Sequence, residues 1–391
     1  MNPKLSLLQP YPFEKLTRIM QDITPPAGLT PLALHIGEPK HDTPQLIFDA
    51  LTAQLNAFAK YPAINGLPEL RAACAAWCRR RYGIEVDENH EIIPTLGSRE
   101  ALFSFVQAAL DTSKDAQPLV LCPNPFYQIY EGATLLAGGQ TVLANTRAPD
   151  FLPDWLEVDD AAWARIQIVF VCSPGNPTGA AMKQHDWQQL FALQDRYGFI
   201  IASDECYSEI YADTPPVGLL QAARADGRDF SRKIMFTSLS KRSNAPGLRS
   251  GFVAGDAAIL KKFLHYRTYH GCAMGLPIQH ASIAAWNDES HVELNRARYR
   301  EKFARVLPVL QQKYAVTLPD ASFYLWLPVP DGDDIAFARQ LWQHAAIQVL
   351  PGSLLARDSA HGNAGQGYVR IALVASLAEC DEAARRMTQL S

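Results

Sequence analysis

The feature that most constrains the fold is an alternation, between residues 90 and 260, of short apolar runs with stretches of helical period. The apolar runs are EIIPTLG, LVLCPNP, IQIVFVCS, FIIASDE, KIMFTSLS and SGFVAG. The segments between them, such as SREALFSFVQAAL and HDWQQLFALQDRYG, have the spacing of amphipathic helices. Because strands that alternate with helices form parallel sheets, we expect an α/β protein whose mostly parallel sheet is wrapped by helices.

The pattern changes after residue 260. A long helical stretch extends to about Trp286, and HVELNRARYREKFARVLPVLQQKY is a second one. Isolated strands, SFYLWLPV and YVRIALV, and a closing amphipathic helix, LAECDEAARRMTQL, follow. We therefore expect a large domain over residues 46–285 and a smaller α+β domain over residues 286–391. The proline-rich residues 1–45 are expected to pack on the small domain or on another subunit.

The composition excludes several classes of protein. The chain has 36 basic and 40 acidic residues and no dense Lys/Arg block, so we expect neither a nucleic-acid nor a membrane partner. The N-terminus lacks the apolar core of a signal peptide, and no apolar run approaches the thickness of a bilayer, which predicts a cytoplasmic protein. Seven scattered cysteines and ten histidines without ligand spacing predict neither a disulfide framework nor a metal site.

Lys241 lies in the segment SLSKRSNAPGLRSG, directly after the strand KIMFT. Most lysines are solvated surface charges, but α/β proteins bind their ligands at strand ends. Ser238 precedes Lys241 and Arg249 follows it, so a hydroxyl and a guanidinium flank the amine if the chain turns back in between. Such a pair can hold a phosphate dianion. A phosphate beside a lysine amine predicts pyridoxal 5'-phosphate bound as a Schiff base.

Polar residues follow three further strands, where each also has an ordinary explanation as a loop or a helix cap. Asn176, in CSPGNPTGA, has an amide suited to the cofactor's ring oxygen. In SDECY, Asp204 has a carboxylate suited to the pyridine nitrogen and Tyr207 a second donor for the ring oxygen. In GSREALF, Ser98 and Arg99 are expected at the start of a helix, where their backbone N–H groups form a phosphate cradle.

Together the motifs GSREAL, NPFYQIY, NPTG, SDECY, SLSKRSNAPGLRSG and YVRIAL resemble those of fold-type I pyridoxal-phosphate enzymes, specifically the class I/II aminotransferases. The resemblance covers nearly the whole chain. It implies a large domain with a mostly parallel seven-stranded sheet between helices, plus a smaller α+β domain. It also implies ping-pong transfer of an amino group, with Lys241 as the Schiff base and proton shuttle and Asp204 and Tyr207 as catalytic partners.

The resemblance assigns roles to further residues. It implies that Tyr127 stacks on the cofactor ring, and that Tyr61 reaches the phosphate across the interface of a homodimer with shared active sites. The residues that it implies for substrate binding are Gly37, Asn176 and Arg370, with Arg370 clamping the α-carboxylate. An arginine inside the apolar strand YVRIAL is costly unless it is paired, which independently favours a buried anionic partner for Arg370.

The segments GEPKHDTP, SDECYSEIY and YRTYHGCAM resemble those of one branch of this family, the proteobacterial N-succinyldiaminopimelate aminotransferases. The first segment departs from the usual family pattern, GxPDFxTP. This likeness implies glutamate as amino donor and N-succinyl-2-amino-6-oxopimelate as acceptor, in lysine biosynthesis. The distal succinyl carboxylate of that substrate needs a cation, for which Lys40, Arg242 and Arg267 are the candidates.

Several alternatives stay open. The alternatives to this substrate are an aminotransferase of aspartate, N-acetylornithine or an aromatic amino acid, and a C–S β-lyase that uses the same lysine and aspartate. A regulator that uses this fold to sense an effector carries an added DNA-binding domain, which we do not expect because the pattern starts within the first 40 residues. A nicotinamide-binding protein is disfavoured because no strand-to-helix turn shows GxGxxG.

Overall fold

Eight strands form the central sheet of the computed structural model, which describes residues 1–390. Their order across the sheet is β2-β9-β8-β7-β6-β3-β4-β5. The strands are β2 (Ile92–Thr95), β3 (Leu119–Asn124), β4 (Gln140–Arg147), β5 (Leu152–Pro153), β6 (Ile166–Cys172), β7 (Ile200–Asp204), β8 (Lys233–Ser238) and β9 (Gly251–Gly255). The pairs β4-β3, β3-β6, β6-β7 and β7-β8 are parallel, whereas β9 runs antiparallel to β2 and β8.

The expected α/β class with a mostly parallel sheet is confirmed, but the sheet has one strand more than the seven implied. The additional strand is β5, whose two residues pair antiparallel with Thr146 and Arg147 at the end of β4. β4 itself is not among the apolar runs that predicted strands. Its first four residues are exposed or only partly buried, so it has no continuous apolar run.

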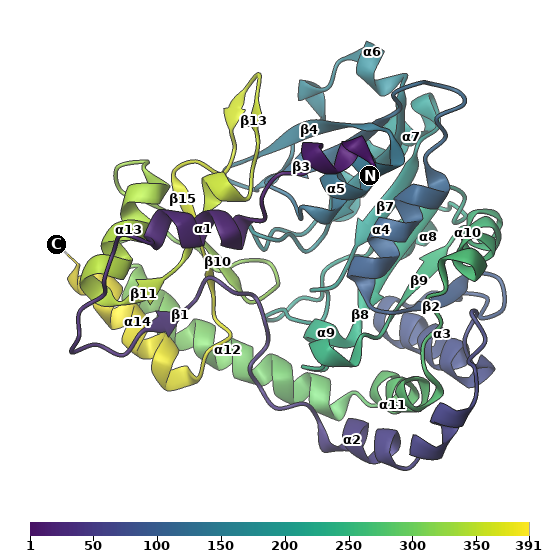
Figure 1. The fold of residues 1–391 in the computed structure, drawn as a ribbon, viewed down its shortest axis with the longest axis horizontal. Coiled ribbons are helices and arrows are strands. Elements are labelled where there is room, and N and C mark those ends of the chain that lie inside the picture. The colour runs from purple at the N-terminus through teal and green to yellow at the C-terminus, as the bar shows by residue number, and fades with distance from the viewer. Residues whose placement is uncertain (391) are drawn as a thin grey trace.

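Helices cover both faces of the sheet (Figure 1). They are α2 (Gln45–Thr52), α3 (Pro68–Tyr82), α4 (Ser98–Ala109), α5 (Ile129–Ala137), α6 (Asp160–Trp163), α7 (Gln184–Tyr197), α8 (Leu219–Ala225), α9 (Leu239–Arg242), α10 (Ala257–His270) and α11 (Leu276–Asn287). Successive residues of β6 point to opposite faces. Val169 and Val171 pack in a cluster with α3, α7, α8 and α11, whereas Ile168 and Phe170 pack with α4, α5 and α10.

The long helical stretch expected up to Trp286 is two helices. α10 ends at His270 because Gly271 adopts a φ of 74°, a left-handed conformation that cannot continue an α-helix. α11 then starts at Leu276 with a proline in its first turn. The chain therefore turns between the two helices, and only α11 packs against α3 and α2.

The C-terminal elements form a third apolar cluster, which includes part of the N-terminal segment. They are α12 (Ser290–Leu310), β10 (Tyr324–Pro328), α13 (Asp334–Ala345), β11 (Ile347–Gln348), β12 (Leu350–Pro351), β13 (Asp358–Ser359), β14 (Gly362–Asn363), β15 (Tyr368–Ala372) and α14 (Leu377–Gln389). From the N-terminal segment, α1 (Pro12–Met20) contributes Leu16 and Met20 and contacts α13, and β1 (Leu32–Ala33) pairs with β11 (Figure 1).

The division into residues 1–45, 46–285 and 286–391 stays a prediction, and residue 391 lies outside the described residues. The chain also forms short 3₁₀ helices at Pro3–Leu7, Leu55–Ala59, Trp155–Glu157, Pro246–Leu248 and Gly352–Leu354.

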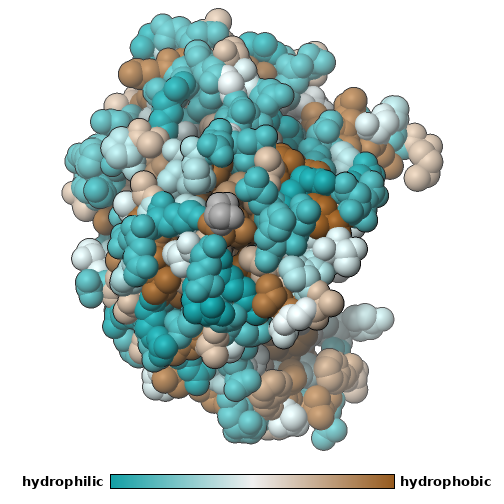
Figure 2. All heavy atoms as spheres, turned by 90° about the vertical axis from the view of Figure 1, so that its left-hand side faces the viewer, coloured by the Kyte–Doolittle hydropathy of each residue, from teal (hydrophilic) through white to brown (hydrophobic). Residues whose placement is uncertain are grey.

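The outer face of the C-terminal part is dominated by hydrophilic side chains (Figure 2). α14 shows why, since its buried residues, Cys380, Ala383, Ala384 and Met387, recur every three or four positions and leave its charged residues toward solvent. Within residues 1–390, no helix combines the length and the apolar composition that a membrane crossing needs.

Candidate active site

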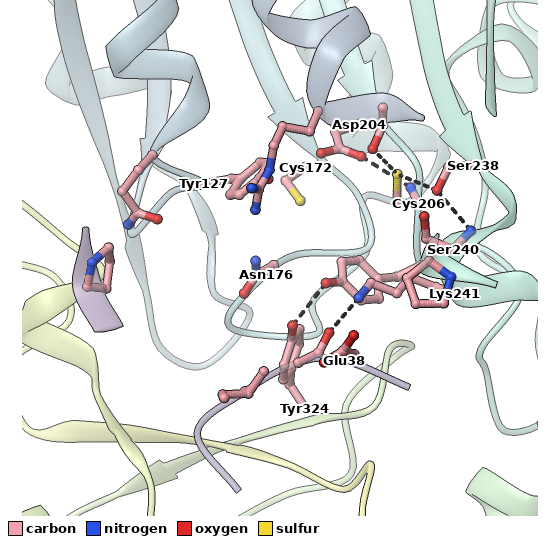
Figure 3. Close-up of a pocket in the computed structure, with 18 of the residues that line it drawn as sticks. Glu38, Tyr127, Cys172, Asn176, Asp204, Cys206, Ser238, Ser240, Lys241 and Tyr324 are labelled. Atoms are coloured by element: carbon pink, nitrogen blue, oxygen red, sulfur yellow. Dashed lines mark hydrogen bonds between the residues drawn. The ribbon is translucent and has the colours of Figure 1, made fainter. Parts of the chain in front are cut away.

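A cavity of about 460 Å³ (Figure 3) lies at the carboxyl edge of the central sheet, and its lining also includes Tyr324 of β10 and Arg370 of β15. Eleven of the twelve predicted site residues line it. They are Gly37, Ser98, Arg99, Tyr127, Asn176, Asp204, Tyr207, Ser238, Lys241, Arg249 and Arg370. The sheet topology explains the convergence of those residues that lie at the ends of its strands, because the ends of parallel strands meet at one edge.

Lys241 projects into the cavity from the short helix α9, which follows β8 directly. Ser238, the last residue of β8, caps that helix by accepting a hydrogen bond from the backbone N–H of Ser240. The Lys241 amine donates to the carbonyl oxygen of Gly37 at 2.5 Å. Burial and, to a lesser extent, the positive charge of Arg370 lower the pKa of Lys241 to about 8. More of the amine is therefore unprotonated near neutral pH than in an exposed lysine, and the neutral form is able to act as a nucleophile.

Asp204 ends β7 and is almost fully buried at the floor of the cavity. Its carboxylate accepts hydrogen bonds from the Tyr130 hydroxyl at 3.0 Å and from the backbone N–H of Cys206 at 3.3 Å. Both donors are neutral, and burial raises the pKa of Asp204. A buried carboxylate held by neutral groups and facing a cavity is suited to a cationic partner, such as a protonated pyridine nitrogen.

Arg370 lies in β15 with 3% of its surface exposed. Its guanidinium donates to Asn176 Oδ1 at 2.8 Å and to the backbone oxygen of His35 at 2.7 Å, and it lies over the ring of Tyr324. All these partners are neutral, and Arg370 Nε is buried without a hydrogen-bond partner among the described residues. This buried cation facing the cavity fits a substrate carboxylate.

A cradle for a phosphate forms where the N-terminus of α4 meets Arg249. Ser98 is the first residue of α4, and the preceding Gly97 has a φ of 80°. A Cβ at residue 97 would lie 2.5 Å from Arg249 Nη2, so this glycine permits the guanidinium to approach the helix end. The Cys206 thiol lies 3.0 Å from Ser98 Oγ and 3.8 Å from Ser238 Oγ, which places both hydroxyls at the same cradle. Helix N–H groups, hydroxyls and a guanidinium are the donors that a phosphate needs.

The remaining predicted residues form the walls. The Tyr207 hydroxyl lies 3.0 Å from that of Tyr324, and burial raises the pKa of Tyr207. Tyr127 accepts a hydrogen bond from Arg99 Nε, and Arg99 Nη2 lies 3.4 Å from the hydroxyl of Tyr11. The residues present therefore fit pyridoxal phosphate: Asp204 suits its ring nitrogen, the cradle of Ser98 and Arg249 suits its phosphate, and the Lys241 amine suits its aldehyde.

Tyr61 is the predicted site residue that the structure does not bring to this cavity. Its side chain is fully exposed in the loop after the 3₁₀ helix Leu55–Ala59. The predicted role of Tyr61 in a partner's site stays a prediction.

Sequence reasoning missed several residues of the site. Tyr130 and Cys206 lie inside the quoted motifs NPFYQIY and SDECY, so the motifs themselves were the signal. Glu38 and Tyr324 also line the cavity, but no local pattern links Tyr324, in SFYLWLPV, to residues far away in the sequence.

A second group of ligating side chains lies at the end of α10. Glu100, His270 and Cys272 have ligand atoms within 4.8 Å of one another. The Glu100 carboxylate is already paired with the buried Arg267 at 2.7 Å, so we assign no metal to this group.

Comparisons with known proteins find similar aminotransferases. A solved structure of an aminotransferase from Neisseria meningitidis is 61% identical, with 100% of both chains covered and a TM-score of 0.98. An LL-diaminopimelate aminotransferase from Desulforudis audaxviator is 32% identical over 387 residues, which cover 97% of this chain and 95% of that relative. A solved probable N-succinyldiaminopimelate aminotransferase from Thermus thermophilus is 25% identical, with 99% of this chain and 100% of that chain covered and a TM-score of 0.84.

The model of the family described as aminotransferase class I and II matches residues 30–387. That match spans nearly the whole chain, including both the sheet edge with Lys241 and the strand with Arg370. The chain belongs to the class I and II aminotransferases, enzymes that depend on pyridoxal phosphate.

Proposed function

We propose that this aminotransferase moves an amino group between glutamate and N-succinyl-2-amino-6-oxopimelate, giving 2-oxoglutarate and N-succinyl-L,L-diaminopimelate, in lysine biosynthesis. The observation that carries the proposal is the pair of cations at the cavity, Arg370 in its wall and Arg99 at its rim, both held only by neutral groups. Two such cations suit a substrate with two separated carboxylates.

The bound cofactor supplies an aldehyde carbon for attachment and a ring that accepts electrons. In the proposal, Lys241 holds the aldehyde carbon, Asp204 holds the ring nitrogen protonated, and Asn176 and Tyr207 bond the ring oxygen. Tyr127 stacks on the ring. The phosphate is held by Ser98, by the backbone N–H of Arg99, and by Ser238 and Arg249, residues that line the cavity.

The substrate is placed by Arg370, which binds the α-carboxylate, with the backbone of Gly37 closing over it. The Lys241 amine would accept the proton from the substrate's Cα and donate it to the carbon that was the cofactor's aldehyde carbon. Its lowered pKa, about 8, suits both halves of this transfer, because the amine accepts and releases a proton near neutral pH.

Two of the residues predicted from sequence to bind the distal succinyl carboxylate, Arg242 and Arg267, are wrong. Arg242 is 2% exposed and paired with Glu289 at 2.8 Å, and Arg267 is fully buried and paired with Glu100. Neither guanidinium reaches the cavity. Arg99 does, and its side-chain partners are the tyrosine hydroxyls described above. We therefore propose Arg99 for this contact.

The proposal includes a homodimer with shared sites. Apolar side chains are exposed in the segment around Tyr61, with Leu55 48% and Phe58 64% exposed. Exposed apolar residues gathered in one segment support burial against a partner, which would bring Tyr61 to the partner's phosphate.

A second candidate substrate is LL-diaminopimelate itself, which the names of curated relatives at about 30% identity support. The two substrates differ by the succinyl group. The test uses the purified holoenzyme with 2-oxoglutarate and, as donors, N-succinyl-L,L-diaminopimelate, LL-diaminopimelate, N-acetylornithine, aspartate and phenylalanine. The proposal expects the highest kcat/KM with the succinylated donor.

Three other results would be decisive. A higher kcat/KM with LL-diaminopimelate would replace the proposed substrate, and one with aspartate would remove both. Release of pyruvate and ammonia from a thioether amino acid, without amino transfer to 2-oxoglutarate, would indicate a C–S β-lyase instead.

A further inference from the structure

A continuous series of buried and partly buried hydrogen bonds joins the turn that carries Lys241 to the end of the strand that carries Arg370. Its side chains are those of His41, Asn295 and Lys302, which we call the relay. No relay side chain lines the cavity. Its contacts are therefore explained neither by substrate binding nor by cofactor binding.

The first end of the relay satisfies the backbone of α9. A helix of four residues leaves its last carbonyl groups without intrahelical partners. Asn295 Nδ2 lies 3.2 Å from the carbonyl oxygen of Lys241 and 3.4 Å from that of Arg242, and donates to both. Asn295 is 3% exposed, so water does not compete for these oxygens. The backbone from which the Lys241 side chain projects is thus fixed by a side chain of α12.

The middle of the relay sets the direction of these bonds. His41 Nε2 lies 2.8 Å from Lys302 Nζ, and His41 Nδ1 lies 2.9 Å from Asn295 Oδ1. An ammonium only donates, so Nε2 accepts and the single proton of the neutral ring is on Nδ1, which donates to Asn295. Burial and the charge of Lys302 both lower the pKa of His41, in keeping with the neutral ring. The Asn295 amide consequently presents its nitrogen to Lys241.

The other end of the relay is attached to the small-domain strand. Lys302 is 3% exposed and also donates to the carbonyl oxygens of Leu373 at 3.1 Å and Val374 at 3.4 Å. These two residues come directly after β15, which carries Arg370. The Lys302 ammonium therefore donates one hydrogen bond to His41, on the way to the turn of Lys241, and two to the residues that follow the strand of Arg370.

We propose that His41, Asn295 and Lys302 are positioning residues that couple the placement of the Lys241 amine to the strand of the carboxylate-binding Arg370. A movement of β15 when a carboxylate binds is then transmitted to the turn of Lys241 through Lys302. His41 stands in GEPKHDTP at the position where the family pattern given above, GxPDFxTP, has phenylalanine, which neither donates nor accepts hydrogen bonds. The inference rests on the proposed role of Lys241.

The coupling is tested by hydrogen exchange on the full-length holoenzyme. The variant Lys302→Met is expected to speed exchange by about fivefold or more in the peptide 239–245 as well as in 372–376, with α7 unchanged. Lys302 makes no hydrogen bond to residues 239–245, so a purely local effect would be confined to 372–376. Faster exchange in 372–376 alone would overturn the coupling. Lys261→Met, an exposed lysine of α10, is the matched control and should change neither peptide.

Kinetics test the positioning role. His41→Phe removes both bonds but keeps a ring against Tyr299, whose centroid is 4.7 Å away. We expect kcat to fall roughly tenfold while KM for the amino donor changes less than about twofold, because a small displacement of a reacting amine slows the chemical step. His41→Gln, which can accept from Lys302 and donate to Asn295, should restore most of kcat.

An unchanged kcat in His41→Phe, or a His41→Gln variant no better than His41→Phe, would overturn the inference. If circular dichroism shows that His41→Phe does not fold, the exchange result of Lys302→Met decides. Borohydride reduction of the wild-type holoenzyme separates this inference from the proposed function. Labelling of a residue other than Lys241 would contradict the proposed function, whatever the result of the hydrogen-exchange experiment.

Discussion

Gly37 and Tyr324 fit together only because residue 37 has no side chain. A Cβ on Gly37 would lie 1.9 Å from the hydroxyl oxygen of Tyr324. The same hydroxyl lies 3.0 Å from that of Tyr207, and the Gly37 carbonyl oxygen accepts from the Lys241 amine. Gly37, in the N-terminal segment, thus contacts both Tyr324 of β10 and the amine of Lys241.

Gly37→Ala should therefore damage the site without unfolding the protein. The methyl group must displace the Tyr324 ring or the backbone of residue 37, and either movement shifts the partners of Lys241 and Tyr207. We expect kcat/KM for the amino donor to fall by roughly tenfold or more. Gly28→Ala is the control, since a Cβ there meets nothing within 4 Å. Equal steady-state kinetics for the two variants would contradict the argument.

Asp204→Asn should remove most of the activity while preserving the local packing. Asparagine can still accept from the Tyr130 hydroxyl but carries no charge to hold a ring nitrogen protonated. We expect kcat to fall by roughly 10² to 10⁴ and the absorbance of the bound cofactor to shift. Asp195→Asn, which breaks an exposed ion pair with Arg228, is the control. A kcat within twofold of the wild type would exclude Asp204 as the ring partner.

The lowered pKa of Lys241 predicts a distinctive pH dependence in the protein freed of cofactor. Only the neutral amine reacts with an acylating reagent, so labelling is slow below the pKa and levels off above it. Because the pKa is about 8, chiefly through burial, the midpoint for Lys241 should lie near pH 8. A lysine in an unstructured peptide has its midpoint near pH 10.4. Peptide mass spectrometry of samples labelled across this pH range gives the midpoint for Lys241 and that for a lysine in an unstructured peptide. If the two midpoints coincide, the prediction is wrong.

Arg99→Gln should alter substrate preference more than the chemical step. If the guanidinium binds the distal succinyl carboxylate, its loss removes a charged hydrogen bond, which corresponds to roughly a tenfold to hundredfold drop in kcat/KM for N-succinyl-L,L-diaminopimelate. Alanine has no distal carboxylate, so its kcat/KM should change by less than about threefold. A parallel fall for both donors would assign Arg99 to the cofactor phosphate instead.

The sequence predicted those parts of the molecule whose signals are local. Asn176, Asp204 and Lys241 each follow an apolar run, and the topology of parallel strands then brings them to one cavity. By contrast β4, whose first half is partly exposed, lacks the apolar run that predicts a strand, and it is defined by its pairing with β3. Helical periodicity predicts one continuous stretch over α10 and α11, whereas in the structure Gly271 ends α10.

The sequence did not predict contacts that depend on tertiary packing. Arg242 and Arg267 are charged residues near the site in the chain, yet each is buried in an ion pair. Which cations are free is decided by the positions of Glu289 and Glu100 in the fold, and no spacing rule shows this. Tyr324 is likewise placed against Gly37 only once β10 packs beside β15.

Mixed dimers provide a test of the shared site that depends on neither substrate nor relay. Lys241→Ala lacks the amine but retains Tyr61, whereas Tyr61→Ala lacks the tyrosine but retains Lys241. If Tyr61 reaches the partner's phosphate, a dimer of one subunit of each kind contains one site with both residues. Unfolding and refolding an equimolar mixture should then give more activity than the sum of the two variants refolded separately. If each subunit instead builds its site alone, mixing gives no gain, and the exposed position of Tyr61 requires another explanation.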